Sequence, residues 1–407
     1  MRLGMLMPYL DGLVTSGGFL REFAAAAEDC GLESIWTVEH VVVAQDYEPL
    51  YPYSPDGKMP GGDLGVPMTD PLETLAFLAG ASTTLKLGTA MVVAPLHSPV
   101  VLAKRAATLD IQSGGRLLLG LGIGWQKEEY AAIGVPFADR GARLDECIGA
   151  MRALWTESPA SYSGTHVSFD KQFCLPQPSR PVPIVLGGNS VPAVRRAGLV
   201  GDGWFPYTIT SDDFARGADR IREIATAEGR SEDAVEMTIW PGSRDFTREF
   251  DADFVRPYVR AGASRIVLTP PMFGEESLLT GVERLADYVD RYRDEVGGEA
   301  VNTVNPVRVL DRVVLPAERA EDWLARWRAD YLPGATARGL RAPRVLRAYH
   351  AADSIALQII WELPGIYDFY GMRAVAAADP DVARFWADTD AIAISRERHI
   401  MAAEEQA

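Results

Sequence analysis

The residues best suited to acid–base chemistry in this chain are its histidines, of which there are five among 407 residues. His40 directly follows the apolar run Ser34–Glu39, a pattern typical of a buried strand. A histidine at the C-terminal end of such a strand can exchange a proton near neutral pH, so His40 is the candidate catalytic residue. The alternative is a histidine that only caps the strand.

The other histidines are weaker candidates. His97 lies in the segment Ala94–Pro99, and it either joins the site or helps to start the next helix. His166, His350 and His399 are expected to be structural or exposed. No two histidines have the spacing of metal ligands, so we expect no metal site.

A strand-to-helix turn with two glycines, Val185-Leu-Gly-Gly-Asn-Ser190, is a candidate phosphate site. Glycines let the backbone approach a ligand, and free amides at a helix start favour an anion. The next strand ends within Gly201–Tyr207, and we expect the two loops to be neighbours on one rim. The alternative is an ordinary turn without a ligand.

A second glycine-rich segment, Gly120-Leu-Gly-Ile-Gly124, lacks the spacing and the later acidic residue of a dinucleotide fingerprint. We therefore do not expect the classical NAD-binding fold. The glycines are expected to relieve crowding at the end of a strand.

The elements that position these residues alternate between strand and helix over about the first 295 residues. Eight such strands favour a parallel (β/α)8 TIM barrel, with an open doubly wound sheet as the alternative. The expected strands are Arg2–Tyr9, Ser34–Glu39, Leu85–Ala94, Arg116–Gly122, Val182–Gly187, Gly203–Pro206, Val235–Trp240 and Arg265–Pro270. Amphipathic patterns predict helices at Phe19–Cys30, Arg143–Trp155, Phe214–Ala227 and Val282–Val296.

Two segments interrupt this alternation. Val41–Thr69 is rich in proline, glycine and tyrosine and leaves the C-terminal end of the second strand, where barrel active sites lie. It is expected to be a loop that covers the substrate, or alternatively an unstructured excursion. Ser161–Pro183 is expected to hold a hairpin of His166–Phe169 and Gln172–Leu175.

The pattern changes after the barrel. We expect domains at residues 1–296 and 307–407, joined by a linker at 297–306. The order β-α-β-β-α-β predicts a ferredoxin-like α+β domain. Its expected elements are strand Val307–Leu315, helix Arg319–Tyr331, strands Arg344–His350 and Ile355–Leu363, helices Phe369–Ala378 and Asp381–Ala387, and strand Ile394–Ile400.

Composition narrows the class of protein. The net charge of −16 gives no electrostatic attraction for nucleic acid. No run of about 18 apolar residues suggests a membrane span, and the N-terminus does not resemble a signal peptide. Cys30, Cys147 and Cys174 are scattered, so we expect no disulfide framework. These features predict a cytoplasmic enzyme.

Over about residues 1–295, the chain resembles the luciferase-like monooxygenase superfamily, in its branch that depends on the deazaflavin coenzyme F420. The segments that carry the resemblance are Trp36–His40, Leu87–Leu96, Leu102–Asp110, Ser113–Arg116, Gly120–Trp125, Glu128–Tyr130, Gly134–Phe137, Pro183–Gly188 and Gly201–Trp204.

The resemblance implies a cofactor ring at the C-terminal mouth of the barrel. It implies a non-proline cis peptide at Ala90–Met91 behind the ring, and an acidic–histidine pair, Glu39–His40, beside it. It also implies that Glu128 contacts the ribityl chain. The implied cofactor-binding residues are Glu39, His40, Ala90, Met91, Glu128, Gly187, Gly188, Asn189 and Tyr207.

Two positions depart from relatives that oxidise a sugar phosphate. Those relatives have a tryptophan where this chain has Ala44, and a catalytic glutamate where it has Trp125. Sugar-phosphate dehydrogenation is therefore not expected, and His40 is the catalytic residue that the resemblance carries over.

Residues 307–401 resemble dimeric αβ-barrel domains of the NIPSNAP or EthD kind. The resemblance implies a homodimer formed through this domain, with a lid role or an independent small-molecule site as the alternatives. Trp323, Trp327, Trp361 and Trp386 are expected to pack in its core or at an interface.

Three functions remain open at this point. The first is hydride transfer between F420 and a small, hydrophobic organic substrate. The second is an FMN-dependent monooxygenase of the same fold, which would need oxygen and a separate reductase. The third is a binding protein that has lost activity.

Overall fold

The computed structural model describes most of the chain. The chain consists of two compact units, Met1–Val301 and Asn302–Ala407. The described residues are 1–9, 12–54, 56–59, 66–244, 252–270, 285–286, 289–290, 307–338, 340–351, 353–363, 372, 376 and 379–402. The expected linker at 297–306 and most of the expected helices Val282–Val296 and Phe369–Ala378 lie outside the described residues.

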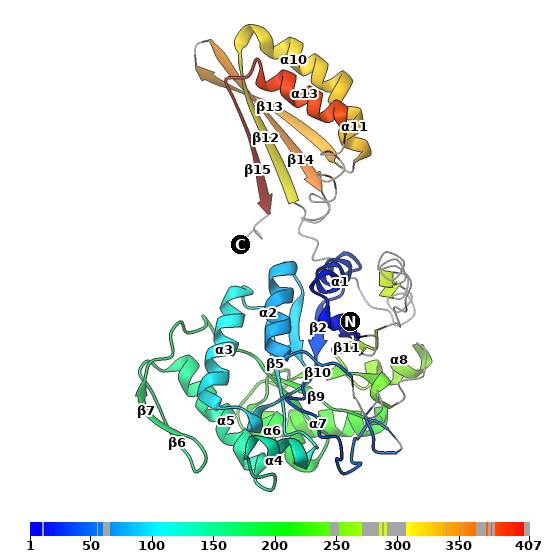
Figure 1. Ribbon diagram of the computed structural model, residues 1–407, viewed down its shortest axis with the longest axis vertical. Helices are drawn as coiled ribbons and strands as arrows, with labels where there is room; N and C mark the ends of the chain where they lie inside the picture. The colour runs from blue at the N-terminus through cyan, green and yellow to red at the C-terminus, as the bar shows by residue number, and fades with distance from the viewer. Residues whose placement is uncertain are drawn as a thin grey trace. The chain divides into compact units, whose positions relative to one another are not determined.

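The first unit is a closed barrel of parallel strands with helices around it (Figure 1). Its strands are β1 (Arg2–Leu6), β2 (Ser34–Thr37), β3 (Lys86–Thr89), β4 (Val92–Val93), β5 (Leu117–Gly122), β8 (Ile184–Gly187), β9 (Gly203–Phe205), β10 (Glu236–Ile239) and β11 (Arg265–Leu268). They follow the order β3-β2-β1-β11-β10-β9-β8-β5-β4, and a further β3–β5 pairing closes the ring. Each predicted strand is present, most of them shortened at one or both ends.

The barrel helices follow the strands in alternation, as the sequence predicted. They are α1 (Gly17–Asp29), α2 (Pro71–Ala81), α3 (Pro99–Gln112), α4 (Lys127–Ile133), α5 (Arg140–Thr156), α6 (Val191–Val200), α7 (Ser211–Ala227) and α8 (Ala252–Arg260). Their apolar sides pack on the outer side chains of the strands in one continuous core. The interior of the barrel holds a second cluster that includes Leu6, Trp36 and Phe205.

The third predicted strand, Leu85–Ala94, is split into β3 and β4. The peptide bond Ala90–Met91 between them is cis, as the family resemblance implied. The Thr89 hydroxyl donates to Gly120 O at 2.7 Å and accepts from Gly120 N at 2.8 Å. A side chain thus replaces the backbone pairing at this point, which is why the strand is interrupted before β4 pairs with β5.

At the N-terminal end of the barrel, a buried arginine joins three strands. Arg265 is 1% exposed and donates to both oxygens of Glu33 at 2.8 Å. It also donates to Thr238 Oγ1 at 3.0 Å and pairs with Glu236 at 3.1 Å. Burial acts to raise the pKa of Glu33, but the hydrogen bonds and charge of Arg265 lower it below its ordinary value.

We expect Arg265→Ala to lower the free energy of unfolding by about 3–5 kcal/mol, because the largely buried Glu33 carboxylate would lose the guanidinium that pairs with it. Urea denaturation followed by circular dichroism measures this. The matched control is Arg216→Ala, an arginine that is 71% exposed in its ion pair, for which we expect a change within about 0.5 kcal/mol. Equal effects of the two substitutions would contradict the prediction.

The hairpin before the fifth barrel strand differs from the prediction. Its strands are β6 (Ala160–Ser163) and β7 (Ser168–Gln172), so the turn lies at residues 164–167. The expected pairing of His166–Phe169 with Gln172–Leu175 was wrong. The carboxylate of Glu146 on α5 accepts from the backbone N–H groups of three turn residues at 2.7–3.0 Å, which fixes the turn there.

The second unit is a four-stranded antiparallel sheet of order β13-β14-β12-β15. Its elements are β12 (Val307–Pro316), α10 (Ala320–Arg326), a π-helical turn (Trp327–Tyr331), α11 (Leu332–Ala337), β13 (Arg341–Ala351), β14 (Ser354–Leu363), α13 (Pro380–Asp390) and β15 (Ser395–Ala402). This is the ferredoxin-like arrangement that the sequence predicted. Trp323, Trp327 and Trp361 are buried in its core, and Trp386 packs against it.

Cys30, Cys147 and Cys174 are free thiols. Among the described residues, no helix combines the length and the apolar character that crossing a bilayer requires. In the same part of the chain, no three histidine, cysteine or acidic side chains lie close enough together to hold a metal ion.

Candidate active site

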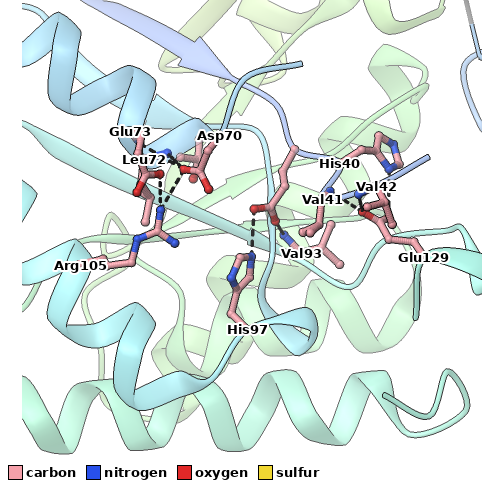
Figure 2. A network of polar contacts seen from close by, with 12 residues as sticks. His40, Val41, Val42, Asp70, Leu72, Glu73, Val93, His97, Arg105 and Glu129 are labelled. Carbon is pink, nitrogen blue, oxygen red and sulfur yellow. Dashed lines mark hydrogen bonds and ion pairs between the residues drawn. The ribbon is translucent and has the colours of Figure 1, made fainter. Parts of the chain in front are cut away.

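His40 lies just beyond the C-terminal end of β2, at the mouth of the barrel. The strand ends at Thr37, where the N–H of Val38 donates to the Tyr9 hydroxyl at 3.1 Å. The His40 side chain is about 10% exposed, and its Nδ1 lies 3.0 Å from Oε2 of Glu129 on α4 (Figure 2). The imidazole is therefore held from its Nδ1 side.

Glu129 is the residue that the sequence did not single out. It is 1% exposed, and its Oε1 accepts from the backbone N–H of Val41 at 2.6 Å and of Val42 at 3.4 Å. One carboxylate thus holds both the imidazole and the start of the loop that follows it. The short segment Glu128–Tyr130 carried the family resemblance, and the two adjacent carboxylates at its start were the signal that could have drawn attention to Glu129.

Glu39 does not pair with its neighbour His40. Its Oε1 lies 2.9 Å from Nε2 of His97, and its Oε2 accepts from the N–H of Val93 at 2.6 Å. The mouth therefore holds two separate carboxylate–histidine pairs, and Figure 2 labels His40 and Glu129 of the first and His97 of the second. His97, which the sequence left open, lies in the second pair at the start of α3.

Glu128, the expected ribityl contact, faces the long loop. Its Oε1 accepts from the backbone N–H of Glu48 at 3.0 Å, while its Oε2 is buried without a hydrogen-bond partner. Its neighbour Lys127 forms an ion pair with the Glu48 carboxylate. Both contacts tie α4 to the long loop.

The described part of Val41–Thr69 is packed against the mouth through a continuous set of aromatic rings. Tyr51 contacts Trp125, with ring centroids 5.6 Å apart, and Tyr53 at 5.2 Å. Tyr53 in turn contacts Tyr207 at 5.5 Å and Trp240 at 5.7 Å. The loop leaves β2 and reaches the ends of β9 and β10, which lie across the ring, so it crosses the mouth.

Aromatic rings also lie beside His40, the candidate catalytic residue. Trp125 lies edge-to-face with His40 at 5.7 Å and with Tyr47 at 5.3 Å. Burial, together with the neighbouring Tyr47, raises the pKa of Tyr51 to about 12. The Tyr51 phenol is therefore neutral at physiological pH, and the mouth presents uncharged rings beside the imidazole.

The far end of the loop is fixed by the helices around the barrel. Asp70 begins α2, and its Oδ1 accepts from the backbone N–H groups of Leu72 at 2.9 Å and Glu73 at 3.1 Å. Arg105 of α3 donates to the same oxygen at 2.9 Å (Figure 2). This network anchors the loop where it returns to the barrel.

The two expected phosphate loops are neighbours, as predicted. Gly187 ends β8 opposite Phe205 of β9, and Asn189 Nδ2 donates to Tyr207 O at 2.9 Å. Gly188 has a φ of +100°, a backbone conformation that favours glycine. Helix α6 then begins with Ser190 as its N-cap.

Met91 joins these loops to the cis peptide. A Cβ added at Gly187 would lie 2.9 Å from Met91 Cγ, and one added at Gly122 would lie 3.2 Å from Met91 Cβ. At Gly120, a Cβ would lie 1.7 Å from Thr89 O. The glycines of Gly120–Gly124 thus relieve crowding, as the sequence analysis expected.

Comparison with known proteins identifies the family. A model of the luciferase-like monooxygenase family matches residues 1–296. The chain belongs to this family. It is a luciferase-like oxidoreductase, and enzymes that depend on F420 are among its relatives.

Curated relatives align with about half of this family member. An uncharacterised protein of Mycobacterium tuberculosis is 32% identical over 218 residues, 54% of this chain and 75% of its own length. An F420-dependent glucose-6-phosphate dehydrogenase of Kineococcus radiotolerans is 30% identical over 234 residues, which cover 54% of this chain and 62% of that enzyme.

Solved structures of other enzymes share the barrel fold. The monooxygenase RslO1 of Streptomyces bottropensis has a TM-score of 0.56 and 22% identity, covering 71% of this chain and 98% of that one. The F420-dependent tetrahydromethanopterin reductase of Methanopyrus kandleri has a TM-score of 0.54 and 16% identity, and the match covers 72% of this chain and 99% of the reductase. At these identities the likeness concerns the fold alone.

Proposed function

We propose that this luciferase-like enzyme uses F420 to transfer hydride between the deazaflavin and a small, hydrophobic organic substrate. The observation that carries the proposal is the position of His40 at the C-terminal mouth, where its ring is held by Glu129. The dehydrogenase of Kineococcus radiotolerans, named as F420-dependent, supports the choice of cofactor.

The residues at the mouth fit a deazaflavin. Gly187 and Gly188 lie between the end of β8 and the N-cap of α6, Ser190, so the backbone there and Asn189 would hold the phosphate. Ala90 and Met91 would lie against the ring, since Met91 packs directly on Gly187. When bound, the deazaflavin would supply a carbon that accepts or gives hydride.

Other expected contacts take narrower roles in the proposal. Glu39 would act through the residues it holds, Val93 and His97, because both of its oxygens are engaged with them. Glu128 would lie at the edge of the site, where its buried Oε2 has no hydrogen-bond partner within the protein. Tyr207 would line the phosphate side, beside Asn189.

The aromatic rings favour a hydrophobic substrate. Trp125 lies next to His40 in the place of the catalytic glutamate of sugar-phosphate dehydrogenases, and its indole cannot exchange a proton there. Tyr51 and Tyr53 add further apolar surface as the loop crosses the mouth. We therefore propose that the loop covers an uncharged substrate.

The competing function is an FMN-dependent monooxygenase with a separate reductase. It remains the alternative because the monooxygenase RslO1 has the same fold. Comparing the binding of F420 and FMN to the purified protein, and measuring oxygen uptake during turnover, tests the proposal. Oxygen-dependent turnover with FMN would contradict it.

We also propose that the second unit forms a homodimer through the face of its sheet that is turned away from the helices. Leu357, Ile359 and Trp361 of β14 face the helices, so Ile360 faces the other way. Leu310 lies opposite Ile360 in the neighbouring strand. On β13, Leu346 pairs with Gln358, shares this outer face and is 50% exposed.

Leu346→Asp is expected to halve the particle mass measured by light scattering, because the substitution would bury a new, unpaired carboxylate where the parent chain buries a leucine. Arg384→Asp, on α13, is the matched control, since Arg384 is 71% exposed in its ion pair. Dimers that persist in the Leu346 variant, or a monomeric parent protein, would contradict this role.

A further inference from the structure

The His40–Glu129 pair fixes more than the position of the imidazole. We propose that Glu129 is a positioning residue that sets the tautomer of His40, so that Nε2 carries the lone pair and accepts the substrate proton. The tautomer follows from the geometry alone, and only its chemical consequence rests on the proposed function.

The first step concerns what Glu129 can do. A carboxylate accepts hydrogen bonds and does not donate them. Here Oε2 lies 3.0 Å from His40 Nδ1, and Oε1 accepts from the N–H groups of Val41 and Val42. In a neutral imidazole one nitrogen carries the proton and the other the lone pair. His40 must then carry its proton on Nδ1.

The second pair at the mouth has the opposite arrangement. Glu39 holds His97 through Nε2 at 2.9 Å, and its other oxygen accepts from the N–H of Val93. A neutral His97 therefore carries its proton on Nε2. Two partly buried histidines of one site are thus expected in opposite tautomers, which gives the experiment an internal reference.

The tautomer determines the chemistry that His40 supports. With a lone pair on Nε2, the ring can take the proton of a substrate hydroxyl while hydride leaves the same carbon for an oxidised deazaflavin. The C–H and O–H bonds break, a C=O bond forms, and the substrate loses two electrons. Glu129 would then stabilise the imidazolium. The substrate class that fits is an uncharged, hydrophobic alcohol.

Substituting Glu129 with glutamine should invert the tautomer. The backbone N–H groups of Val41 and Val42 require an oxygen at the Oε1 position. The amide NH2 group is then placed opposite His40 Nδ1 and donates to it, so the ring proton moves to Nε2. Glu128→Gln is the matched control on the same helix, because Glu128 contacts the backbone of Glu48 and not the imidazole.

The test is nitrogen NMR of the full chain labelled with ¹⁵N-histidine, at about pH 8.5, above the ordinary histidine pKa of about 6.5. With five histidines, His40→Gln and His97→Gln assign the two signals. We expect Nδ1–H for His40 and Nε2–H for His97. Glu129→Gln should convert His40 to Nε2–H and leave His97 unchanged, which also shows that the mouth remains folded.

Three results would overturn the proposal: an Nε2–H or doubly protonated His40 in the parent protein, an unchanged His40 tautomer in Glu129→Gln, or the same inversion in Glu128→Gln. The spectra require neither cofactor nor substrate. Failure of this inference is therefore distinguishable from failure of the proposed use of F420.

Discussion

His40→Ala is expected to lower turnover of a hydrophobic alcohol by about 100-fold, the usual contribution of a positioned general acid–base group. The fold should persist, because Glu129 Oε1 keeps its hydrogen bonds to the N–H groups of Val41 and Val42. The measurement is the initial rate of deazaflavin reduction at saturating cofactor. Cofactor affinity, measured separately, reports whether the mouth remains intact.

His166→Ala is the matched control for that prediction. His166 also has an acidic neighbour, with its Nδ1 3.7 Å from Asp139, but it lies in the turn of the β6–β7 hairpin. Its removal should leave the rate within about twofold of the parent value. A His40 variant with normal turnover would remove this residue from the chemistry, whatever its tautomer.

The barrel could be predicted from the sequence because each strand is a short apolar run. Ile35 and Leu119, for example, are fully buried. The apolar pattern did not predict the residue at which each strand ends. Glu39 was assigned to a strand because the run before it is apolar, yet pairing ends at Thr37, where Tyr9 receives the next N–H.

The site was only partly predictable for a related reason. His40 and the neighbouring phosphate loops follow from strand order alone, because the ends of parallel strands meet on one rim. The side chains that contact His40 and Glu39 could not be predicted from strand order, because they are distant in sequence: Glu129 lies 89 residues from His40, and His97 lies 58 residues from Glu39. The family resemblance implied an acidic–histidine pair, Glu39–His40, beside the ring, and in the folded chain the two side chains contact different partners.

The second large effect concerns cofactor binding. Gly188→Val should weaken binding of the cofactor by at least tenfold, because a branched side chain would stand in the proposed phosphate loop at a φ of +100°. Gly229→Val is the matched control. Its φ is +75°, and an added Cβ meets nothing within 4 Å. Both variants carry backbone strain. A loss of cofactor affinity in Gly188→Val but not in Gly229→Val would therefore support a phosphate contact at Gly188.

The measurement that tests the central claim most directly is a titration of the purified full chain with F420 and, separately, with FMN. We expect F420 to bind at least 100-fold more tightly, a difference of about 2.7 kcal/mol in binding free energy. Gly188→Val should reduce the affinity for F420, because the substitution blocks the proposed phosphate loop. Tight binding of FMN together with no binding of F420 would contradict the account.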